Sequence, residues 1–109
     1  MKNAFYFLLL ALFTLTTPAC QKALYEEDLV YVGAWSSDRY FIEIAANGFG
    51  FYQKRNNGLK DCRVKIKNSR IVFDWDGGRK SFRIDNPPSI ELTTGRIYMT
   101  LNGRDFYQH

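Results

Sequence analysis

Residues 60–75 read KDCRVKIKNSRIVFDW, two runs of alternating side chains joined by Asn68-Ser69. In the first run Cys62, Val64 and Ile66 fall on one side, and the residues between them are charged. Successive side chains of a β-strand point to opposite faces of a sheet, so this period of two indicates a half-buried strand. Asn tolerates the positive φ that a tight turn requires. The segment therefore predicts a β-hairpin with one face toward a core.

The same arrangement of a short alternating run and a turn repeats along most of the chain. The turn signals are rich in Asn and Gly, and their spacing of about 8–12 residues is typical of antiparallel sandwiches and barrels. They are Asn47-Gly48, Asn56-Asn57-Gly58, Asn68-Ser69, Asp76-Gly77-Gly78, Asn86-Pro87-Pro88, Thr94-Gly95 and Asn102-Gly103. After residue 29 no segment keeps apolar residues at helical spacing over three turns. We therefore expect essentially no helix there, and at most a helical turn near residues 22–28.

These turns separate eight expected strands. They are residues 29–36, 40–45, 49–54, 60–67, 70–75, 80–85, 90–93 and 96–101, and residues 104–107 would add a ninth. Short connections make sequential strands neighbours, which gives an up-and-down meander. The predicted fold class is all-β: an antiparallel eight-stranded meander, forming a small barrel or a flattened sandwich, after an N-terminal signal helix. Eight strands enclose a space that side chains nearly fill, or that holds one small ligand.

The N-terminal 19 residues have the pattern of a secretory signal. Lys2 precedes an apolar run over residues 4–13, and small residues lead up to Cys20. That run is shorter than the roughly 18 residues needed to cross a bilayer. A cysteine directly after the small residues resembles the signal of bacterial lipoproteins. The resemblance implies acyl chains such as palmitate on Cys20 and a place in the cell envelope, and Gln21 in place of Asp implies the outer membrane.

This signal divides the chain into three parts: a lipoprotein signal peptide at residues 1–19, a tether at residues 20–29 and a β-barrel domain at residues 30–109. The formal net charge of the whole chain is +4. Its basic residues are scattered rather than clustered, which argues against nucleic acid as a partner.

The chain contains only two cysteines, Cys20 and Cys62. If Cys20 carries lipid, Cys62 has no partner for an intramolecular disulfide, and its inward strand position predicts a buried thiol. If the signal is cleaved elsewhere, an exported chain allows a Cys20–Cys62 disulfide instead.

Residues that support catalysis are scarce in this sequence. The only histidine is His109, at a terminus that we expect to be mobile, so Ser-His and Cys-His arrangements and tetrahedral zinc sites are not expected. Asp74 and Asp76 share one strand face and could share a proton or hold a cation. The alternative is a solvated face with Arg79 or Lys80 across the hairpin. We predict a protein that is not an enzyme, with no metal and no cofactor.

One short motif points to a family. Gly33-Ala34-Trp35 resembles the Gly-x-Trp that opens lipocalin-type barrels, and the hairpin at residues 47–51 is similar to those of small lipocalin-like lipoproteins of bacteria. The resemblance implies a barrel with Trp35 plugging one end. Strand alternation predicts an interior that would line a ligand site, made of Trp35, Phe51, Phe73, Trp75 and Met99.

Two functions follow from this interpretation. The first is a non-catalytic envelope lipoprotein, held to the membrane by its N-terminal lipid, that binds a small apolar ligand inside the barrel. The alternative is a protein-binding module, such as an inhibitor or immunity factor for an envelope enzyme. Such a module usually projects a loop, and the sequence offers residues 55–58 and 76–80 as candidates.

Overall fold

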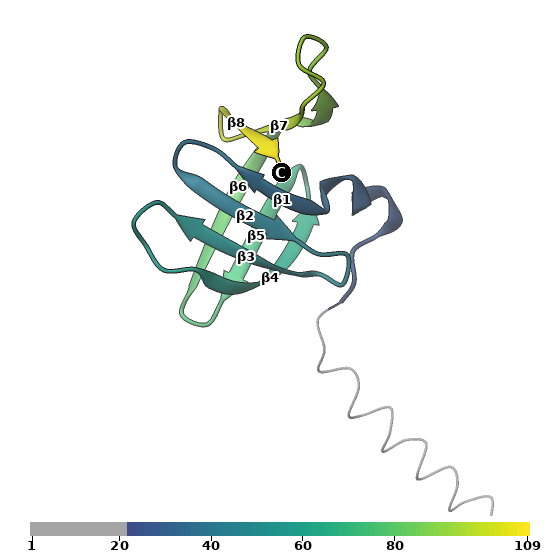
Figure 1. Ribbon diagram of the computed structural model, residues 1–109. Coiled ribbons are helices and arrows are strands. Elements are labelled where there is room, and N and C mark those ends of the chain that lie inside the picture. Colours follow the sequence, from purple (N-terminus) through teal and green to yellow (C-terminus); the bar gives the residue numbers. More distant parts are fainter. Residues whose placement is uncertain (1–21) are drawn as a thin grey trace, which may run out of the picture.

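The last strand of the sheet pairs with the first and closes it into a barrel, as the computed structural model shows for residues 22–109, the part of the chain that it describes (Figure 1). All neighbouring strands are antiparallel and follow one another in chain order. The strands are β1 (Gly33–Ser36), β2 (Tyr40–Ile44), β3 (Phe49–Lys54), β4 (Lys60–Lys67), β5 (Arg70–Trp75), β6 (Gly78–Ile90), β7 (Ile97–Leu101) and β8 (Arg104–Gln108). The predicted all-β meander is confirmed, and the barrel is the form it takes. The predicted signal peptide and Cys20 lie outside the described residues.

Strand β6 is the main departure from the predicted strands. Two strands were expected at residues 80–85 and 90–93, with a turn at Asn86-Pro87-Pro88, but one strand runs from Gly78 to Ile90. Prolines lack an N–H and are tolerated in a strand only at edges or bulges. Both conditions hold here, because β5 ends its pairing at Arg83 and the pairing with β7 has irregular register between Ile84 and Ser89. The expected ninth strand is β8, the one that closes the barrel.

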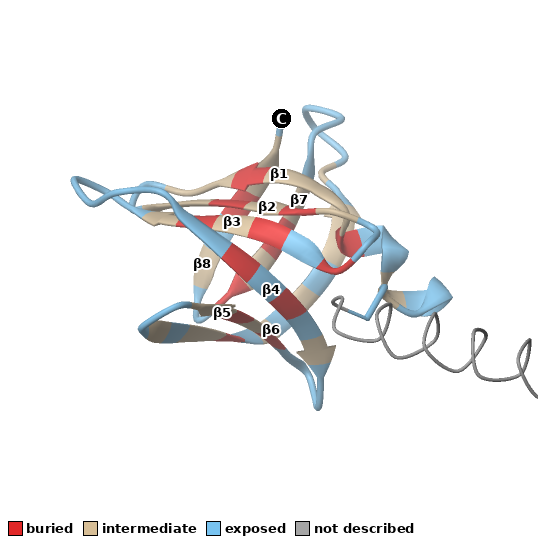
Figure 2. Ribbon diagram, turned by 90° about the horizontal axis from the view of Figure 1, so that it is seen from below, coloured by how far each residue is buried: buried red, intermediate tan, exposed pale blue. Residues whose placement is uncertain are grey.

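Inward-facing side chains from all eight strands form one hydrophobic core (Figure 2). In β4 the buried positions are Cys62 and Val64, with exposed Arg63 and Lys65 beside them, as the alternation predicts. The fully buried side chains include Trp35, Ile42, Ile44, Val64, Ile71, Phe73, Phe82, Met99, Leu101 and Phe106. Because the sheet closes on itself, this core has no open side that needs another domain.

The chain before β1 is part of the domain rather than a free tether. A 3-10 helix, η1, spans Glu26–Tyr31, close to the helical turn expected near residues 22–28. Upstream, the Leu24 N–H donates to the Ala46 carbonyl (3.1 Å), and the Leu24 side chain packs against the core. The expected first strand, residues 29–36, begins only at Gly33, whose φ of 140° suits glycine. A Cβ there would meet Gln108 Nε2 at 2.7 Å.

The buried polar side chains of the described residues all take part in hydrogen bonds. Within residues 22–109 no buried side-chain nitrogen or oxygen lacks a hydrogen-bond partner. The core and every strand pairing that closes the barrel also come from this part of the chain. Residues 22–109 therefore contain what an independently folding domain requires, and we expect them to fold without the segment that precedes them.

Candidate functional site

The predicted ligand-lining residues are only partly brought together. Trp35, Phe73 and Met99 are fully buried in the core, and Trp75 is half-buried and packs against it. Phe51 lies on the outer face of β3, so its predicted inward position is wrong. The inward positions of this strand are Gly50 and Tyr52, because the backbones of neighbouring strands approach too closely at residue 50 for a larger side chain.

Aromatic rings occupy the middle of the barrel. Phe82 packs edge-on against three others: Phe73 at a centroid distance of 6.0 Å, Phe106 at 5.6 Å and Tyr40 at 5.3 Å. Edge-to-face contacts at these distances are those of a packed aromatic core. These rings therefore occupy the space inside the barrel in which the predicted ligand would bind.

One end of the barrel is covered by further rings. Trp75 stacks on Tyr52 at 5.2 Å and an interplanar angle of 12°. The Lys80 ammonium lies 5.4 Å from the centroid of the Tyr40 ring, so a cation also covers this end. A Cβ on Gly78 would overlap the Trp75 indole, which explains why a glycine begins β6. The covering rings leave this end without a wide mouth.

The candidate carboxylates border a hollow of about 510 Å³ beside β4 and β5. Its lining residues are Phe49, Asp61, Cys62, Arg63, Asp74, Trp75, Asp76 and Gly77. Asp74 is paired with Arg79 across the hairpin, Oδ1 to Nε 2.6 Å, as the solvated-face alternative predicts. Among residues 22–109 no three His, Cys, Asp or Glu side chains gather as metal ligands. Of the three carboxylates that line the hollow, Asp74 is therefore neutralised by Arg79, whereas Asp61 and Asp76 belong to no ion pair of the described residues.

Cys62, which also lines this hollow, is a free and buried cysteine, as predicted. Its side chain is directed inward, and Sγ lies 3.3 Å from the Lys60 carbonyl oxygen, to which it donates. Desolvation by burial, helped by the charge of Asp61, raises the pKa of the thiol to about 11. A thiol that stays protonated is a poor nucleophile, because the thiolate is the reactive form.

His109 is held in place rather than mobile. Its backbone N–H donates to the Ala34 carbonyl (2.9 Å), and its Nε2 lies 2.8 Å from Ser36 Oγ. The sequence did not lead us to expect a Ser-His pair. In the hydrogen bonds of the described residues, no carboxylate orients the other ring nitrogen, a role that Ser-His-Asp sites assign to a buried acid. The exposed pair serves to fasten the end of the chain to β1.

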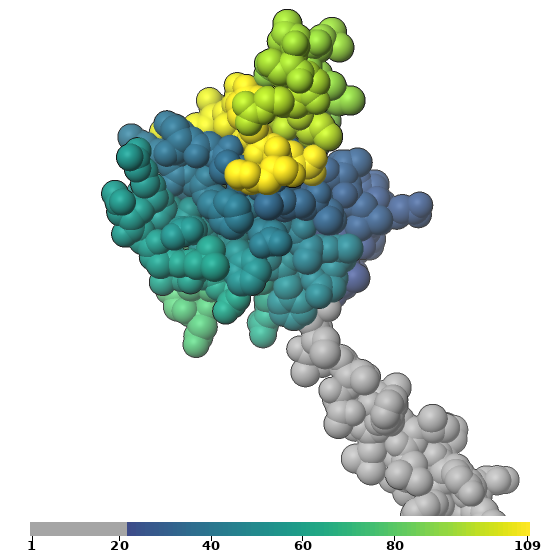
Figure 3. All heavy atoms as spheres, viewed as in Figure 1, coloured from purple at the N-terminus to yellow at the C-terminus, as the bar shows by residue number. Residues whose placement is uncertain are grey.

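A more distinctive feature is a hairpin arm formed by residues 84–97, which joins the ends of β6 and β7 (Figure 1). Beyond Arg83 the strand β6 has no strand pairing with β5, and its only strand partner among the described residues is β7. At the base of the arm the Ile84 N–H also donates to the Ser69 carbonyl in the β4–β5 turn (2.8 Å). The arm consequently leaves the barrel wall and projects from it (Figure 3). Pro87 and Pro88 lie in its unpaired stretch, where missing N–H groups discourage further strands from adding to the edge.

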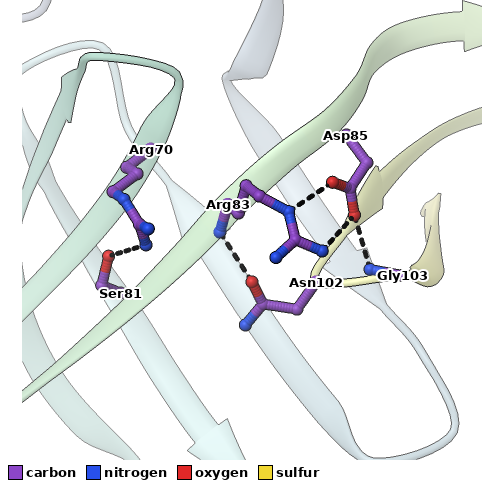
Figure 4. A network of polar contacts seen from close by, with 6 residues as sticks. All are labelled: Arg70, Ser81, Arg83, Asp85, Asn102 and Gly103. Atoms are coloured by element: carbon purple, nitrogen blue, oxygen red, sulfur yellow. Dashed lines mark hydrogen bonds and ion pairs between the residues drawn. The ribbon is translucent and has the colours of Figure 1, made fainter.

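The base of the arm is clamped to the β7–β8 turn (Figure 4). Asp85 accepts hydrogen bonds from the Arg83 guanidinium (2.6 and 3.2 Å) and from the Gly103 N–H (2.6 Å). The Arg83 N–H donates to Asn102 Oδ1 at 2.7 Å. These bonds hold the pKa of Asp85 below its ordinary value of 3.8, first through Arg83 and then through Gly103. The arm therefore leaves the barrel in a defined direction.

The loop at the tip of the arm is also fixed by hydrogen bonds. The Glu91 N–H donates to the Arg96 carbonyl, and the Gly95 N–H donates to the Glu91 carbonyl, both at 2.8 Å. The hydroxyls of Thr93 and Thr94 donate to Glu91 Oε1 at 3.3 and 3.2 Å. Gly95 has a φ of 73°, a conformation that glycine adopts without strain. The loop is thus ordered without help from any ligand.

This ordered loop presents apolar side chains to solvent. Leu92 is 95% exposed, and the cross-strand partners Ile90 and Ile97 are 64% and 37% exposed. Single exposed apolar residues are common on protein surfaces, but a cluster on a projecting and ordered tip indicates an interaction site. Local sequence patterns did not reveal this site. Residues 90–93 were expected to form a barrel strand, and the site lies in neither of the candidate loops at residues 55–58 and 76–80.

Within residues 22–109 no helix has the length and apolar character needed to span a bilayer. Comparison of the chain with protein-family models, curated proteins and solved structures gave no match in any of the three.

Proposed function

We propose that this chain is a non-catalytic, lipid-anchored binding module of the bacterial cell envelope that docks its hairpin arm into an apolar pocket of a protein partner. The observation that carries the proposal is Leu92, which is almost wholly exposed in a loop that is ordered by its own hydrogen bonds. Burying a leucine side chain contributes about 1.5–3 kcal/mol. A loop ordered in advance loses little conformational entropy when it binds.

The filled interior supports this function over the binding of a small apolar ligand. Of the side chains expected to line a ligand site, Trp35, Phe73, Trp75 and Met99 belong to the core or pack against it. Phe82 and its ring neighbours occupy the space between the strands. A protein inhibitor or immunity factor needs no interior space, because it binds through its surface.

The state of three candidate reactive groups in residues 22–109 supports a binding role. The thiol of Cys62 is protonated and buried, Asp74 is neutralised by Arg79, and His109 lacks an orienting acid among its described hydrogen bonds. The anchor in this proposal is the lipid on Cys20, at the outer membrane, as the resemblance to lipoprotein signals implies.

The arm can be tested with a matched pair of leucine variants. The purified domain, residues 22–109, would be used to capture partners from envelope extract, and the captured protein would be identified, purified and titrated against the domain. We expect Leu92→Ser to weaken this binding by about tenfold or more, as for a central contact residue. Leu59→Ser is the control, because Leu59 is also an exposed loop leucine (52%) but lies between β3 and β4 at the other end of the barrel.

Two results would contradict the proposal. One is a purified partner that binds the Leu92→Ser and Leu59→Ser variants equally well. The other is a domain that captures no protein in stoichiometric amount but carries an apolar small molecule in native mass spectrometry, which would favour an interior ligand.

A further inference from the structure

Basic side chains gather on the outer face of β4 and at the start of β5. They are Arg63, Lys65, Lys67 and Arg70, here called the basic face, and all four are exposed. Lys67 and Arg70 are direct cross-strand partners. Like charges opposite one another on neighbouring strands destabilise a sheet. The two cations therefore destabilise the pairing of β4 with β5, although neutral side chains would fit equally well at these solvent-exposed positions.

Arg63 lies directly across from Asp74, but the ion pairs within residues 22–109 include none of Lys65, Lys67 and Arg70. They join Asp74 to Arg79, Asp85 to Arg83 and Asp38 to Arg104. Arg70 has one polar contact, from its guanidinium to Ser81 Oγ at 3.4 Å (Figure 4). The positive charge of the face is therefore available to an anionic partner.

The segment before η1 lies alongside this face. Lys22 and Tyr25 border the same groove, of about 330 Å³, as Lys65 and Lys67. One acidic residue, Asp28, also reaches this groove, and the rest of its lining, Ala23, Leu24, Val64 and Ile66, is apolar. Lysines and a tyrosine above apolar side chains are the combination found where proteins meet the headgroup region of a membrane.

We infer that the basic face binds the anionic headgroups of a lipid bilayer and sets the orientation of the barrel on it. Each Lys or Arg near an anionic membrane adds attraction, and several on one flat face act together. The inference does not depend on a partner for the arm. The base of the arm adjoins the β4–β5 turn, where the Ile84 N–H donates to the Ser69 carbonyl, but the arm itself projects away from the segment before η1 (Figure 1).

The test uses the unlipidated domain, residues 22–109, so that acyl chains do not contribute to binding. Its sedimentation is measured with vesicles of phosphatidylcholine alone and of phosphatidylcholine mixed with phosphatidylglycerol. We expect binding to the mixed vesicles only, with loss at high salt because salt screens exposed charges. The triple variant Lys65→Glu, Lys67→Glu, Arg70→Glu is expected to bind at least about tenfold less.

The control is the triple variant Arg39→Glu, Lys54→Glu, Arg55→Glu, which changes the net charge equally. These residues are exposed near the β1–β2 and β3–β4 connections, at the opposite end of the barrel from the β4–β5 turn. Circular dichroism melts establish that both variants fold. Three results would overturn the inference. They are an equal loss of vesicle binding in both triple variants, equal binding of the wild-type domain to the two kinds of vesicle, and binding to a DNA oligonucleotide without binding to vesicles.

Discussion

The hydroxyl of Tyr107 on β8 donates a hydrogen bond to Glu91 Oε2, 3.1 Å away, at the start of the arm's loop. The other oxygen of the same carboxylate accepts from Thr93 and Thr94 inside the loop. The Arg96 guanidinium lies over the Tyr107 ring, 4.1 Å from its centroid. Glu91 thus shapes the loop and also ties it to the barrel wall, so the direction in which Leu92 points is set by β8.

Replacing Tyr107 by Phe tests this tie, because the ring and its contact with Arg96 remain while the hydroxyl is lost. We expect faster amide hydrogen exchange in residues 91–96, with little change in the midpoint of global unfolding, since the loop opens locally. The control is Tyr98→Phe, which removes a neighbouring hydroxyl that has no hydrogen-bond partner among the described residues. If both variants exchange like the wild type, the hydroxyl does not hold the arm.

A second prediction concerns Gly50, where three strands come close together. A Cβ at this position would overlap the Glu43 carbonyl oxygen and lie 2.8 Å from Val64 Cγ2. Backbone cannot move away as a flexible side chain can, so we expect Gly50→Ala to lower the free energy of unfolding by about 1–3 kcal/mol in urea titrations. Gly58→Ala is the control, because its Cβ would meet nothing within 4 Å. Equal stability of the two variants would mean that the strands separate easily at residue 50.

The same glycine shows what local patterns could and could not predict. Strands β3, β4 and β5 have the predicted limits, because strong alternation and Asn-rich turns are local signals. In β3, however, aromatic residues occupy both faces, and Phe51 looked as suitable for the interior as Tyr52. Close approach of neighbouring backbones at Gly50 decides the inward face, and that approach depends on strands distant in the sequence.

The arm was unpredictable for a related reason. Asn86-Pro87-Pro88 has the composition of a turn, but in the structure β6 continues through these residues. Because β5 pairs with β6 only as far as Arg83, the rest of β6 is a strand edge, and no local pattern near residue 86 indicates this. The exposure of Leu92 follows from this extension. In a barrel strand over residues 90–93, the same leucine would be expected to pack against the core. The binding site proposed for the arm thus arises from strand pairing rather than from a motif.

A third prediction concerns the reactivity of Cys62. Because burial raises the pKa of this thiol to about 11, we expect alkylation by iodoacetamide at pH 8 to be slow in residues 22–109 and to become fast in urea. The raised pKa also means that the neutral thiol stabilises the fold below its ordinary pKa of 9.0, and that this contribution is lost as the pH rises toward 11. Rapid alkylation without denaturant would instead place the sulfur at the surface.

The last prediction concerns Asp85, whose carboxylate accepts hydrogen bonds from Arg83 and Gly103 at the base of the arm. Its pKa in the folded chain is lowered from 3.8, so folding favours the charged form. The resulting stabilisation is present above 3.8 and is lost as the pH falls through the lower folded value. We expect Asp85→Asn to lower the urea midpoint at neutral pH, and the difference from wild type to shrink in titrations that descend through pH 3.8.

Asp61→Asn is the matched control, because Asp61 is an exposed carboxylate outside the described ion pairs. The urea midpoint of the Asp61→Asn variant is expected to follow that of the wild type through the same pH range. If the Asp85→Asn difference persists unchanged at the lowest pH, it arises from the neutral side chain's packing and not from the charge. In that case the clamp between β6 and the β7–β8 turn would depend on Asn102, whose Oδ1 accepts the Arg83 N–H and does not titrate.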